Sequence, residues 1–388
     1  MKSEKYIYLL GVVIFLMTSL GAKAKSHNNP KNHPQYEQLQ EALEKYEEIA
    51  NNGGFHEVPW FEGALNLGAV SDVVPDIRKR LATTGDIEEE AGKSDSREYD
   101  EDVALAVGKF QKRHGLQVDG ITGPATLQQM NKPIDDKLEK IKFSLDSWAD
   151  LPEDLGEKYI FVNIPEFELT AYEDKDDKKF SMRVIVGDEY NGQETPAFND
   201  SMQYIEFNPY WNIPHSIVQR TMLPQAREDT TYLERNNYEI VDQFAEDAEV
   251  FENTQENLDL LEQEELFLRQ KPGPNNAMGQ MKFMFPNEYA IYLHDTPQDH
   301  LFDVEERTFS NGCIRVENPV KLAEYLLKDN TNAPGHWNRQ RIIQEANQDE
   351  TTQIYLIDRT PIYIIYWTAF VDEDGNLNFR DDIYDENV

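Results

Sequence analysis

The stretch Ser310-Asn311-Gly312-Cys313-Ile314-Arg315 contains the only cysteine of the 388-residue chain, and His294 lies upstream of it. One thiol cannot form an internal disulfide, so Cys313 is either a buried apolar side chain or a reactive nucleophile. A nucleophilic thiol needs a base or a cation within hydrogen-bond reach. We therefore expect the fold to bring the Cys313 sulfur and the His294 imidazole together at an open cleft.

The neighbours of Cys313 favour the nucleophile. Gly312 has no Cβ, so the backbone there can direct the amides of Gly312 and Cys313 at a developing oxyanion. Arg315 supplies a positive charge that suits a thiolate or, through its planar fork, a substrate carboxylate. Each residue alone also has a plain structural explanation, because a lone cysteine is more often buried and an arginine can pair with any acid. The combination is what indicates acyl transfer.

The composition excludes some partners. The chain has 73 Asp plus Glu against 37 Lys plus Arg, a formal net charge of −36. Such a field repels nucleic acid and anionic lipid, so we expect neither as a partner. With 39% hydrophobic and 11% aromatic residues, the chain can build sizeable cores.

The first 24 residues have the pattern of a secretory signal peptide. Lys2 and Lys5 give a positive start, residues 6–20 are mostly apolar, and Ala22-Lys23-Ala24 matches the small-x-small cleavage pattern. The apolar run is short beside the roughly 20 residues of a membrane span, although an uncleaved anchor stays open. We expect residues 1–24 to be removed and the protein to work outside the cytoplasm.

Residues 25–67 predict a polar tail and then one amphipathic helix over residues 36–49. A compact helical domain is expected over residues 68–132. Its first helix opens at Pro75, and its second runs over residues 101–114.

Turns complete this helical domain. The first helix is expected to end near Gly85 and the second at Gly115, while Thr122 is expected to cap a short third helix. The acidic stretch 88–102 predicts a solvated loop. Residues 133–158 are expected to be a linker.

From residue 159 onward the pattern is that of strands. β-branched and aromatic residues, alternating in places, predict strands over 159–164, 168–172, 182–187, 204–207, 280–285, 289–293, 353–357 and 362–367. Between them, residues 214–279 break the strand pattern with helical spacing and many acids. We interpret this segment as a helical lid inserted in the sheet, with a decorative surface insertion as the alternative. The fold class is therefore α+β: a mostly-β catalytic domain over 159–388 and a small all-α domain.

Several familiar catalytic signatures are missing. The sequence has no Cys pair for zinc, no His-Glu-x-x-His, no Gly-x-Ser-x-Gly and no phosphate-binding glycine loop. We therefore expect no cofactor and no metal, and what remains is a thiol and an imidazole.

Two segments of the sequence resemble known protein families. Ala104, Phe110-Gln111, Gly115-Leu116, Val118-Asp119-Gly120, Thr122-Gly123 and Thr126-Leu127 are spaced as in the small peptidoglycan-binding module of bacterial cell-wall enzymes. His294 followed by residues 310–316 resembles the active-site motif of the YkuD-type L,D-transpeptidases. The resemblance extends to Gly187, 194–196, 208–214, 272–274, 291–297 and 379–384, and is greatest to the large-lidded branch of Gram-negative envelopes.

The resemblance implies roles for individual residues. Cys313 is the acylated nucleophile, His294 the base and later the acid, and Gly312 an oxyanion donor. Tyr292, Ser310, Asn311 and Arg315 contribute to the substrate pocket. Many family members have a second histidine where this chain has Asn311, whose amide cannot take a proton. We expect His294 alone to suffice for proton transfer.

The implied activity is a cysteine-dependent L,D-transpeptidase of the periplasm or cell envelope, with peptidoglycan stem peptides and glycan as partners. Cys313 attacks the L,D amide of a tetrapeptide stem, D-alanine leaves, and a side-chain amine of a second stem accepts the acyl group in a 3→3 cross-link. The resemblance also predicts acylation by a carbapenem. Two alternatives stay open: a peptidoglycan-binding scaffold with an inactive catalytic domain, and a thiol hydrolase, or L,D-carboxypeptidase, of the same fold. The oligomeric state is not predicted.

Overall fold

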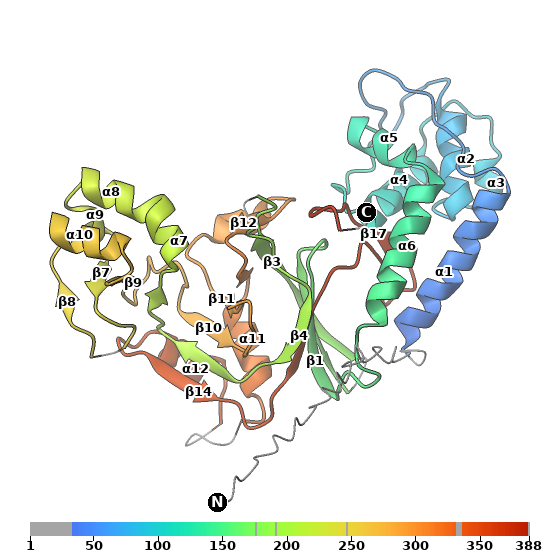
Figure 1. The fold of residues 1–388 in the computed structure, drawn as a ribbon. Coiled ribbons are helices and arrows are strands. Elements are labelled where there is room, and N and C mark those ends of the chain that lie inside the picture. The colour runs from blue at the N-terminus through green and yellow to red at the C-terminus, as the bar shows by residue number, and fades with distance from the viewer. Residues whose placement is uncertain (1–32, 175–176, 191, 246, 331–335, 387–388) are drawn as a thin grey trace, which may run out of the picture.

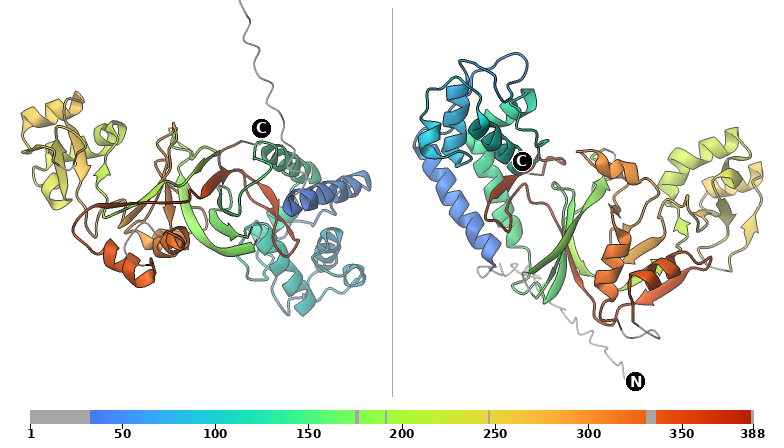
Figure 2. Two further views of the ribbon diagram at one scale, coloured as in Figure 1. Left: turned by 90° about the horizontal axis from the view of Figure 1, so that it is seen from below. Right: turned by 180° about the vertical axis from the view of Figure 1, so that it is seen from behind.

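A computed structural model gives the structure of residues 33–174, 177–190, 192–245, 247–330 and 336–386. The expected signal segment 1–24 lies outside these described residues. The expected α+β class is confirmed, with helices gathered in the N-terminal part and a large sheet in the rest of the chain (Figure 1). The N-terminal helices and the inserted segment lie at opposite ends of the molecule, with the sheet between them (Figure 2).

The N-terminal part is helical. Its helices are α1 Pro34–Asn51, α2 Val74–Thr84, α3 Glu89–Gly92, α4 Glu101–Arg113, α5 Pro124–Met130 and α6 Ile134–Trp148. Gly85 ends α2 with a φ of +82°, as the sequence predicts, and Asp100 caps α4 by accepting from the Val103 amide at 3.1 Å.

Two expectations for this part are wrong. Thr122 does not cap α5, because Gly123 occupies the N-cap position and no side chain caps that helix. Thr122 is instead fully buried, with its hydroxyl 3.0 Å from that of Tyr99. The acidic stretch 88–102 is also not loop throughout, since it contains α3 and the start of α4.

The expected linker 133–158 contains the 15-residue helix α6. Its buried side chains include Leu138, Ile141 and Trp148, which pack in one cluster with residues of α1 and of the sheet. The Trp148 ring stacks on Trp367 with 4.3 Å between ring centroids. This segment is therefore part of the packed structure that joins the two halves of the chain.

Eleven strands form the main sheet. They run in the order β14-β5-β10-β11-β13-β3-β2-β1-β15-β4, and β12 pairs with β3. Their bounds are β1 Lys158–Asn163, β2 Glu168–Glu173, β3 Asp177–Gly187, β4 Phe198–Ser201, β5 Tyr204–Phe207, β10 Met281–Met284, β11 Leu293–His294, β12 Thr308–Ser310, β13 Ile314–Val316, β14 Thr352–Tyr355 and β15 Pro361–Ile365.

Strand β3 joins the two halves of this sheet. Its residues up to Arg183 pair with β2, whereas Val184 and Ile185 pair with β13. Apolar side chains from both halves form one core together with helices α11 Pro319–Leu327 and α12 Arg339–Ala346. Helix α11 begins at a side-chain cap, because Asn318 accepts from the Lys321 amide at 3.1 Å and Pro319 occupies the first turn.

The strand expected over 289–293 is mostly wrong, because β11 contains only Leu293 and His294. Ala290 has a φ of +55°, and the Asn287 side chain accepts from the Ile291 amide at 3.0 Å. These local contacts hold the chain in a turn before β11. His294 therefore lies within the strand rather than after it.

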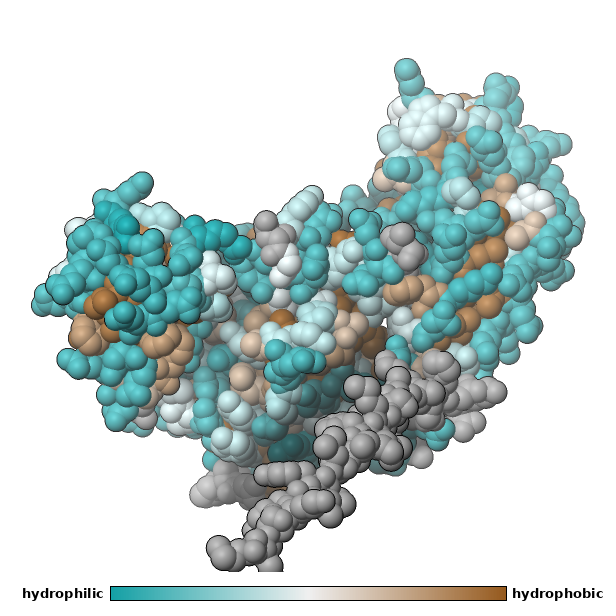
Figure 3. All heavy atoms as spheres, in the orientation of Figure 1, coloured by the Kyte–Doolittle hydropathy of each residue, from teal (hydrophilic) through white to brown (hydrophobic). Residues whose placement is uncertain are grey.

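The insertion is not only helical. Besides helices it has a four-stranded antiparallel sheet in the order β6-β9-β7-β8. Its elements are β6 Trp211–Asn212, α7 His215–Ile217, the π-helical turn η1 Val218–Met222, α8 Leu223–Glu228, α9 Tyr232–Arg235, β7 Tyr238–Val241, β8 Val250–Phe251, α10 Gln255–Glu262 and β9 Phe267–Gln270. The outer face of this insertion is largely hydrophilic (Figure 3).

The last elements return to the N-terminal helices. The hairpin of β16 Ala369–Val371 and β17 Leu377–Phe379 turns at residues 372–375. The 3-10 turn η2 Asp299–Asp303 follows β11. Arg113 of α4 donates to the Leu377 carbonyl at 2.9 Å, and Lys132 pairs with Asp381 at 2.8 Å. The helical domain is thus docked on the C-terminal segment.

Candidate active site

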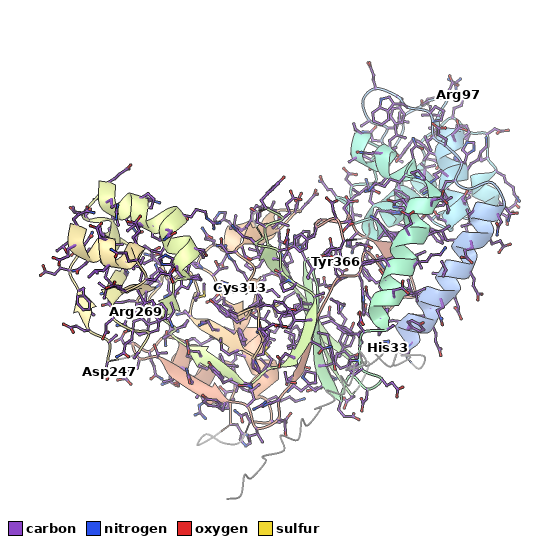
Figure 4. All side chains as sticks on the ribbon, in the orientation of Figure 1. His33, Arg97, Asp247, Arg269, Cys313 and Tyr366 are labelled. Carbon is purple, nitrogen blue, oxygen red and sulfur yellow. The ribbon has the colours of Figure 1, made fainter. Side chains whose placement is uncertain are left out.

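The register of β11 and β13 brings the motif residues together. Leu293 pairs with Ile314 and His294 with Arg315 in parallel, and both Leu293 and Ile314 are fully buried in the core. Side chains alternate along a strand, so His294 and Arg315 lie on the opposite face. The Ile314 amide extends the pairing by donating to the Tyr292 carbonyl at 3.1 Å, which places Cys313 beside Tyr292. Figure 4 shows Cys313 between the insertion and the central strands.

His294 is held as a neutral imidazole. Its side chain is 2% exposed, and burial, followed by the positive charges of Arg315 and Lys282, lowers its pKa to about 3. Its Nδ1 lies 2.6 Å from the Asp295 carbonyl oxygen. A carbonyl oxygen can only accept, so Nδ1 must carry the proton and Nε2 has a free lone pair. His294 is therefore poised as a base through Nε2.

Cys313 rests as a neutral thiol. Burial raises its pKa, while hydrogen bonds from Tyr292 and the charges of Lys282 and Arg315 act in the opposite direction. The thiol lies 3.8 Å from the Ala290 carbonyl oxygen, to which it can donate. Within the part of the chain that the structure describes, no hydrogen bond joins the thiol to His294. The pair lies on neighbouring strands, and catalytic contacts often tighten only when substrate binds.

Tyr292 lies against both members of the pair. Its ring meets the His294 ring edge to face at 5.8 Å, and its side chain lies close enough to the thiol to lower the pKa of Cys313. Burial, followed by the charge of a Cys313 thiolate, raises the pKa of Tyr292 well above its usual value. The hydroxyl thus stays protonated and can donate to sulfur. Lys282 of β10 pairs with His294 in register and places its ammonium 4.6 Å from the Tyr292 ring centre.

The turn before Cys313 is tightly held. Gly312 has a φ of +105°, a conformation that suits glycine. Its amide donates to Ser310 Oγ at 3.1 Å, and Ser310 is buried. The Gly312 amide is therefore already engaged, which argues against the expectation that it donates to an oxyanion.

The carbonyl of Gly312 accepts from Thr195 Oγ1 at 2.8 Å, and this hydroxyl in turn accepts from the Gly187 amide at 2.9 Å. In a trans peptide the N–H points away from the C=O of the same unit. Thr195 thus fixes the direction of the Cys313 amide. Tyr384 of the C-terminal segment braces the same place by donating to the Gly187 carbonyl at 2.6 Å.

Arg315 and Asn311 flank Cys313 from either end of the motif. The Arg315 guanidinium donates to Gln298 Oε1 at 2.8 Å and to the Phe309 carbonyl at 3.4 Å, and its buried Nε has no partner. Burial lowers the pKa of Arg315, against the influence of the Cys313 charge. Asn311 is exposed, and its Oδ1 accepts at 2.8 Å from Arg220 of the insertion.

The sequence did not single out Thr195, Lys282 or Arg220. Thr195 lies in segment 194–196, which resembles the family, but the resemblance did not indicate what Thr195 does. Lys282 is the one charged residue in the otherwise apolar strand 281–285. Its position could have indicated that one face of this strand is polar. No pattern in the sequence marks Arg220, because its contact with Asn311 depends on how the insertion folds.

Among the described residues, no group of three or more His, Cys, Asp or Glu side chains is arranged to hold a metal ion. In the same part of the chain, the membrane-span criteria of length and apolar character are met by no helix.

Comparison with protein families gives two matches. Residues 157–364, more than half of the chain, match the L,D-transpeptidase catalytic domain family YkuD, and residues 71–130 match a peptidoglycan binding domain family. A curated Haemophilus influenzae protein with a provisional L,D-transpeptidase name is 34% identical over 225 residues. The match covers 58% of this chain and 44% of that relative, so the chain spans less than half of the relative's length.

Solved structures give weaker likenesses. An L,D-transpeptidase from Xylanimonas cellulosilytica is 15% identical, with 79% of this chain and 99% of that chain covered and a TM-score of 0.23. Another from Stackebrandtia nassauensis is 14% identical, with 78% and 94% covered and a TM-score of 0.29. At such TM-scores the assignment depends on the family match in sequence.

Proposed function

Because the chain belongs to the YkuD family of L,D-transpeptidases, we propose that it forms 3→3 cross-links in peptidoglycan through an acyl-enzyme on Cys313. The observation that carries the proposal is the pairing of β11 with β13, which sets Cys313 beside Tyr292 and on the same face as His294, two residues further along β11. The coverage of the curated relative is partial, so the activity of the whole protein is part of the proposal.

The first half of the reaction forms a thioester. His294 Nε2 takes the thiol proton while Sγ attacks the carbonyl carbon of the L,D amide in a tetrapeptide stem. The resulting oxyanion accepts from the Cys313 amide, whose direction Thr195 fixes. The C–N bond then breaks, His294 returns the proton to the leaving amine, and D-alanine departs.

The second half transfers the acyl group. The side-chain amine of another stem attacks the thioester carbonyl and loses a proton to His294 Nε2. Collapse of this intermediate breaks the C–S bond, and the sulfur regains its proton. The same oxyanion donor serves both steps, because the carbonyl carbon stays at the same place.

The resting charges favour general-base catalysis over a preformed ion pair. The pKa of His294 is lowered to about 3 and that of Cys313 is raised, so at neutral pH the imidazole and the thiol are both uncharged. Proton transfer then accompanies attack instead of preceding it. The side chain of Tyr292, which lowers the pKa of Cys313, stabilises the negative charge that develops on sulfur.

Arg315 is proposed to hold a substrate carboxylate. Its recorded acceptors are a neutral amide and a backbone carbonyl, and its Nε is unpartnered. A half-buried guanidinium without a carboxylate partner among the described residues is a costly arrangement that an anionic substrate would relieve. Tyr292, Ser310 and Asn311 complete the proposed pocket wall, with Ser310 acting through the Gly312 turn.

The two matched families act on peptidoglycan, which points to the cell envelope as the place of action. We propose a periplasmic enzyme that needs neither a cofactor nor a metal. A carbapenem should acylate Cys313 as the stem peptide does.

Product analysis on purified muropeptides tests the proposal. The wild-type chain should release D-alanine and form 3→3 dimers, whereas Cys313→Ala should do neither while keeping its thermal midpoint. Dimer formation by Cys313→Ala would refute the nucleophile. Release of D-alanine with only tripeptide as product would instead identify a hydrolase.

A further inference from the structure

Arg220 reaches from the insertion to the active-site turn. It lies in the π-helical turn η1 and donates through Nη2 to Asn311 Oδ1 at 2.8 Å. In the amide orientation that satisfies both groups, Gln193 Oε1 also accepts from Nη1 and Nη2 of Arg220, and Gln193 donates to Asn311 Oδ1 at 3.0 Å. The three side chains thus form one hydrogen-bonded group two residues before the nucleophile.

The charge of Arg220 has no counter-ion in this group. Both acceptors are neutral amides, and no ion pair of Arg220 is recorded in the part of the chain that the structure describes. Arg227, in the neighbouring helix α8, behaves differently and pairs with Asp259 at 2.7 Å and Glu262 at 2.6 Å. In a chain with 73 acidic side chains, an exposed arginine held only by amides is available for an outside anion.

The Arg220 guanidinium also has N–H groups that these contacts do not use. It carries five N–H groups, and the three contacts to Asn311 and Gln193 use three of them. The remaining two, the Nε–H and one Nη1–H, lie on different edges of the guanidinium, and each can donate a single charge-assisted hydrogen bond to a carboxylate oxygen. π-helical turns are rare and are often found at functional sites, which fits the place of Arg220 in η1.

The position of Arg220 complements that of Arg315. Arg315 lies two residues after Cys313, and the anchor of Arg220, Asn311, lies two residues before it. A stem peptide carries a terminal carboxylate, which the net charge of −36 would repel from most of this protein. Among the described residues, Arg220 and Arg315 have no carboxylate partner and contact or belong to the motif around Cys313, which makes the active site the exception.

From these contacts we infer that Arg220, with Gln193 and Asn311, is a second carboxylate-binding site, which holds the terminal carboxylate of a stem peptide next to Cys313. The inference rests on the proposed transpeptidase function and deepens it. It also gives the insertion a role in specificity, since Arg220 belongs to η1 of the insertion and contacts the motif turn.

Paired substrates test the inference. Synthetic tetrapeptide donors and acceptor peptides are made with a free or an amidated C-terminus. Acylation of Cys313 in the full chain is followed by intact mass with each donor, and transfer is then followed with each acceptor. The variants are Arg220→Gln and Arg220→Lys, and Arg227→Gln is the matched control in the same insertion.

The wild type and Arg227→Gln should prefer the free carboxylate over the amide by about tenfold or more in one of the two arms, as a charge-assisted contact requires. Arg220→Gln should abolish that preference, because the rate with the free carboxylate should fall more than the rate with the amidated peptide, which never makes the charge-assisted contact. Arg220→Lys should retain part of it. If the preference changes in acylation, Arg220 binds the donor stem, and if it changes in transfer, Arg220 binds the acceptor stem.

Two results would overturn the inference. One is an unchanged preference for the free carboxylate in Arg220→Gln. The other is an equal loss of rate with free and amidated peptides, which would show that Arg220 holds the motif turn in place and does not contact the carboxylate. Calorimetry measures the affinity of the same peptides for Cys313→Ala and for the double variant that also carries Arg220→Gln. Because neither variant has the thiol, this comparison reports binding alone. A wild type that never acylates would contradict the proposed function, and the calorimetry would still decide the role of Arg220.

Discussion

Thr195 is the residue through which the proposed oxyanion donor can be tested. It is 1% exposed, and its hydroxyl joins the Gly187 amide to the Gly312 carbonyl, at 2.9 and 2.8 Å. Thr195→Val keeps the shape of the side chain but replaces the hydroxyl by a methyl group. The change leaves one buried donor and one buried acceptor without a partner.

The size of the effect follows from those two groups. An unsatisfied buried polar group costs about 1–3 kcal/mol, so Thr195→Val should lower the free energy of unfolding by about 2–5 kcal/mol. The Gly312 carbonyl belongs to the same peptide unit as the Cys313 amide, so the proposed donor also loses its fixed direction. Complete loss of an oxyanion donor costs about 10²–10³ in rate, and we expect a misdirected one to cost at least about tenfold.

The matched control is Thr195→Ser, which keeps the hydroxyl and loses one buried methyl group, at a cost of about 1 kcal/mol. Urea unfolding followed by tryptophan fluorescence measures stability, and intact mass measures the rate of Cys313 acylation by a tetrapeptide. The serine variant should acylate at close to the wild-type rate. If the valine and serine variants unfold at the same urea concentration and acylate equally fast, Thr195 does not position the Cys313 amide.

Four further outcomes are expected. Because burial raises the pKa of Cys313, its alkylation by iodoacetamide should still be rising at pH 9, and a plateau near pH 6 would indicate a preformed thiolate. His294→Gln should lower acylation about 10²–10⁴-fold while leaving alkylation at pH 9 nearly unchanged, and equal losses in both assays would contradict a general-base role. Gly312→Ala should lose about 1–3 kcal/mol of stability and most acylation, since its φ is +105° and a Cβ would lie 3.2 Å from Ile291; wild-type values in thermal unfolding and mass assays would argue against a strained turn. Removal of residues 230–265 should raise hydrolysis relative to transfer in product analysis, and an unchanged ratio would exclude a water-excluding lid.

The sequence predicts those features that depend on nearby residues. Asn318 and Pro319 start a helix by local capping, Gly85 ends one, and the alternating strand at residues 204–207 matches β5. The motif at Cys313 belongs to this class as well, because its glycine conformation is set within the turn. Such features need no knowledge of the tertiary fold.

At two other places the sequence has a clear pattern, but the expected element differs from the one in the structure. Ile134, Leu138, Ile141, Leu145 and Trp148 recur at helical spacing, and this pattern predicts α6 where a linker was expected. The apolar alternation at residues 289–293 is compatible with a strand, but side-chain hydrogen bonds of Asn287 compete with the ladder there.

The rest depends on contacts between distant residues. The contact of Arg220 with Asn311, of Thr195 with Gly312, and of Lys282 with the Tyr292 ring each joins separate parts of the chain. The short strands of the insertion are likewise stabilised by one another across loops. No periodicity of a single segment encodes such contacts, so the polar support of the proposed site emerges only with the fold.

The most direct measurement is the mass of the full-length chain after incubation with a tetrapeptide stem and no amine acceptor. A single thiol in the sequence makes the result unambiguous. The proposed reaction predicts the addition of one tripeptide acyl group, which peptide mapping locates at Cys313, together with release of one D-alanine. Release of D-alanine without a covalent species, or an adduct on another residue, would contradict it.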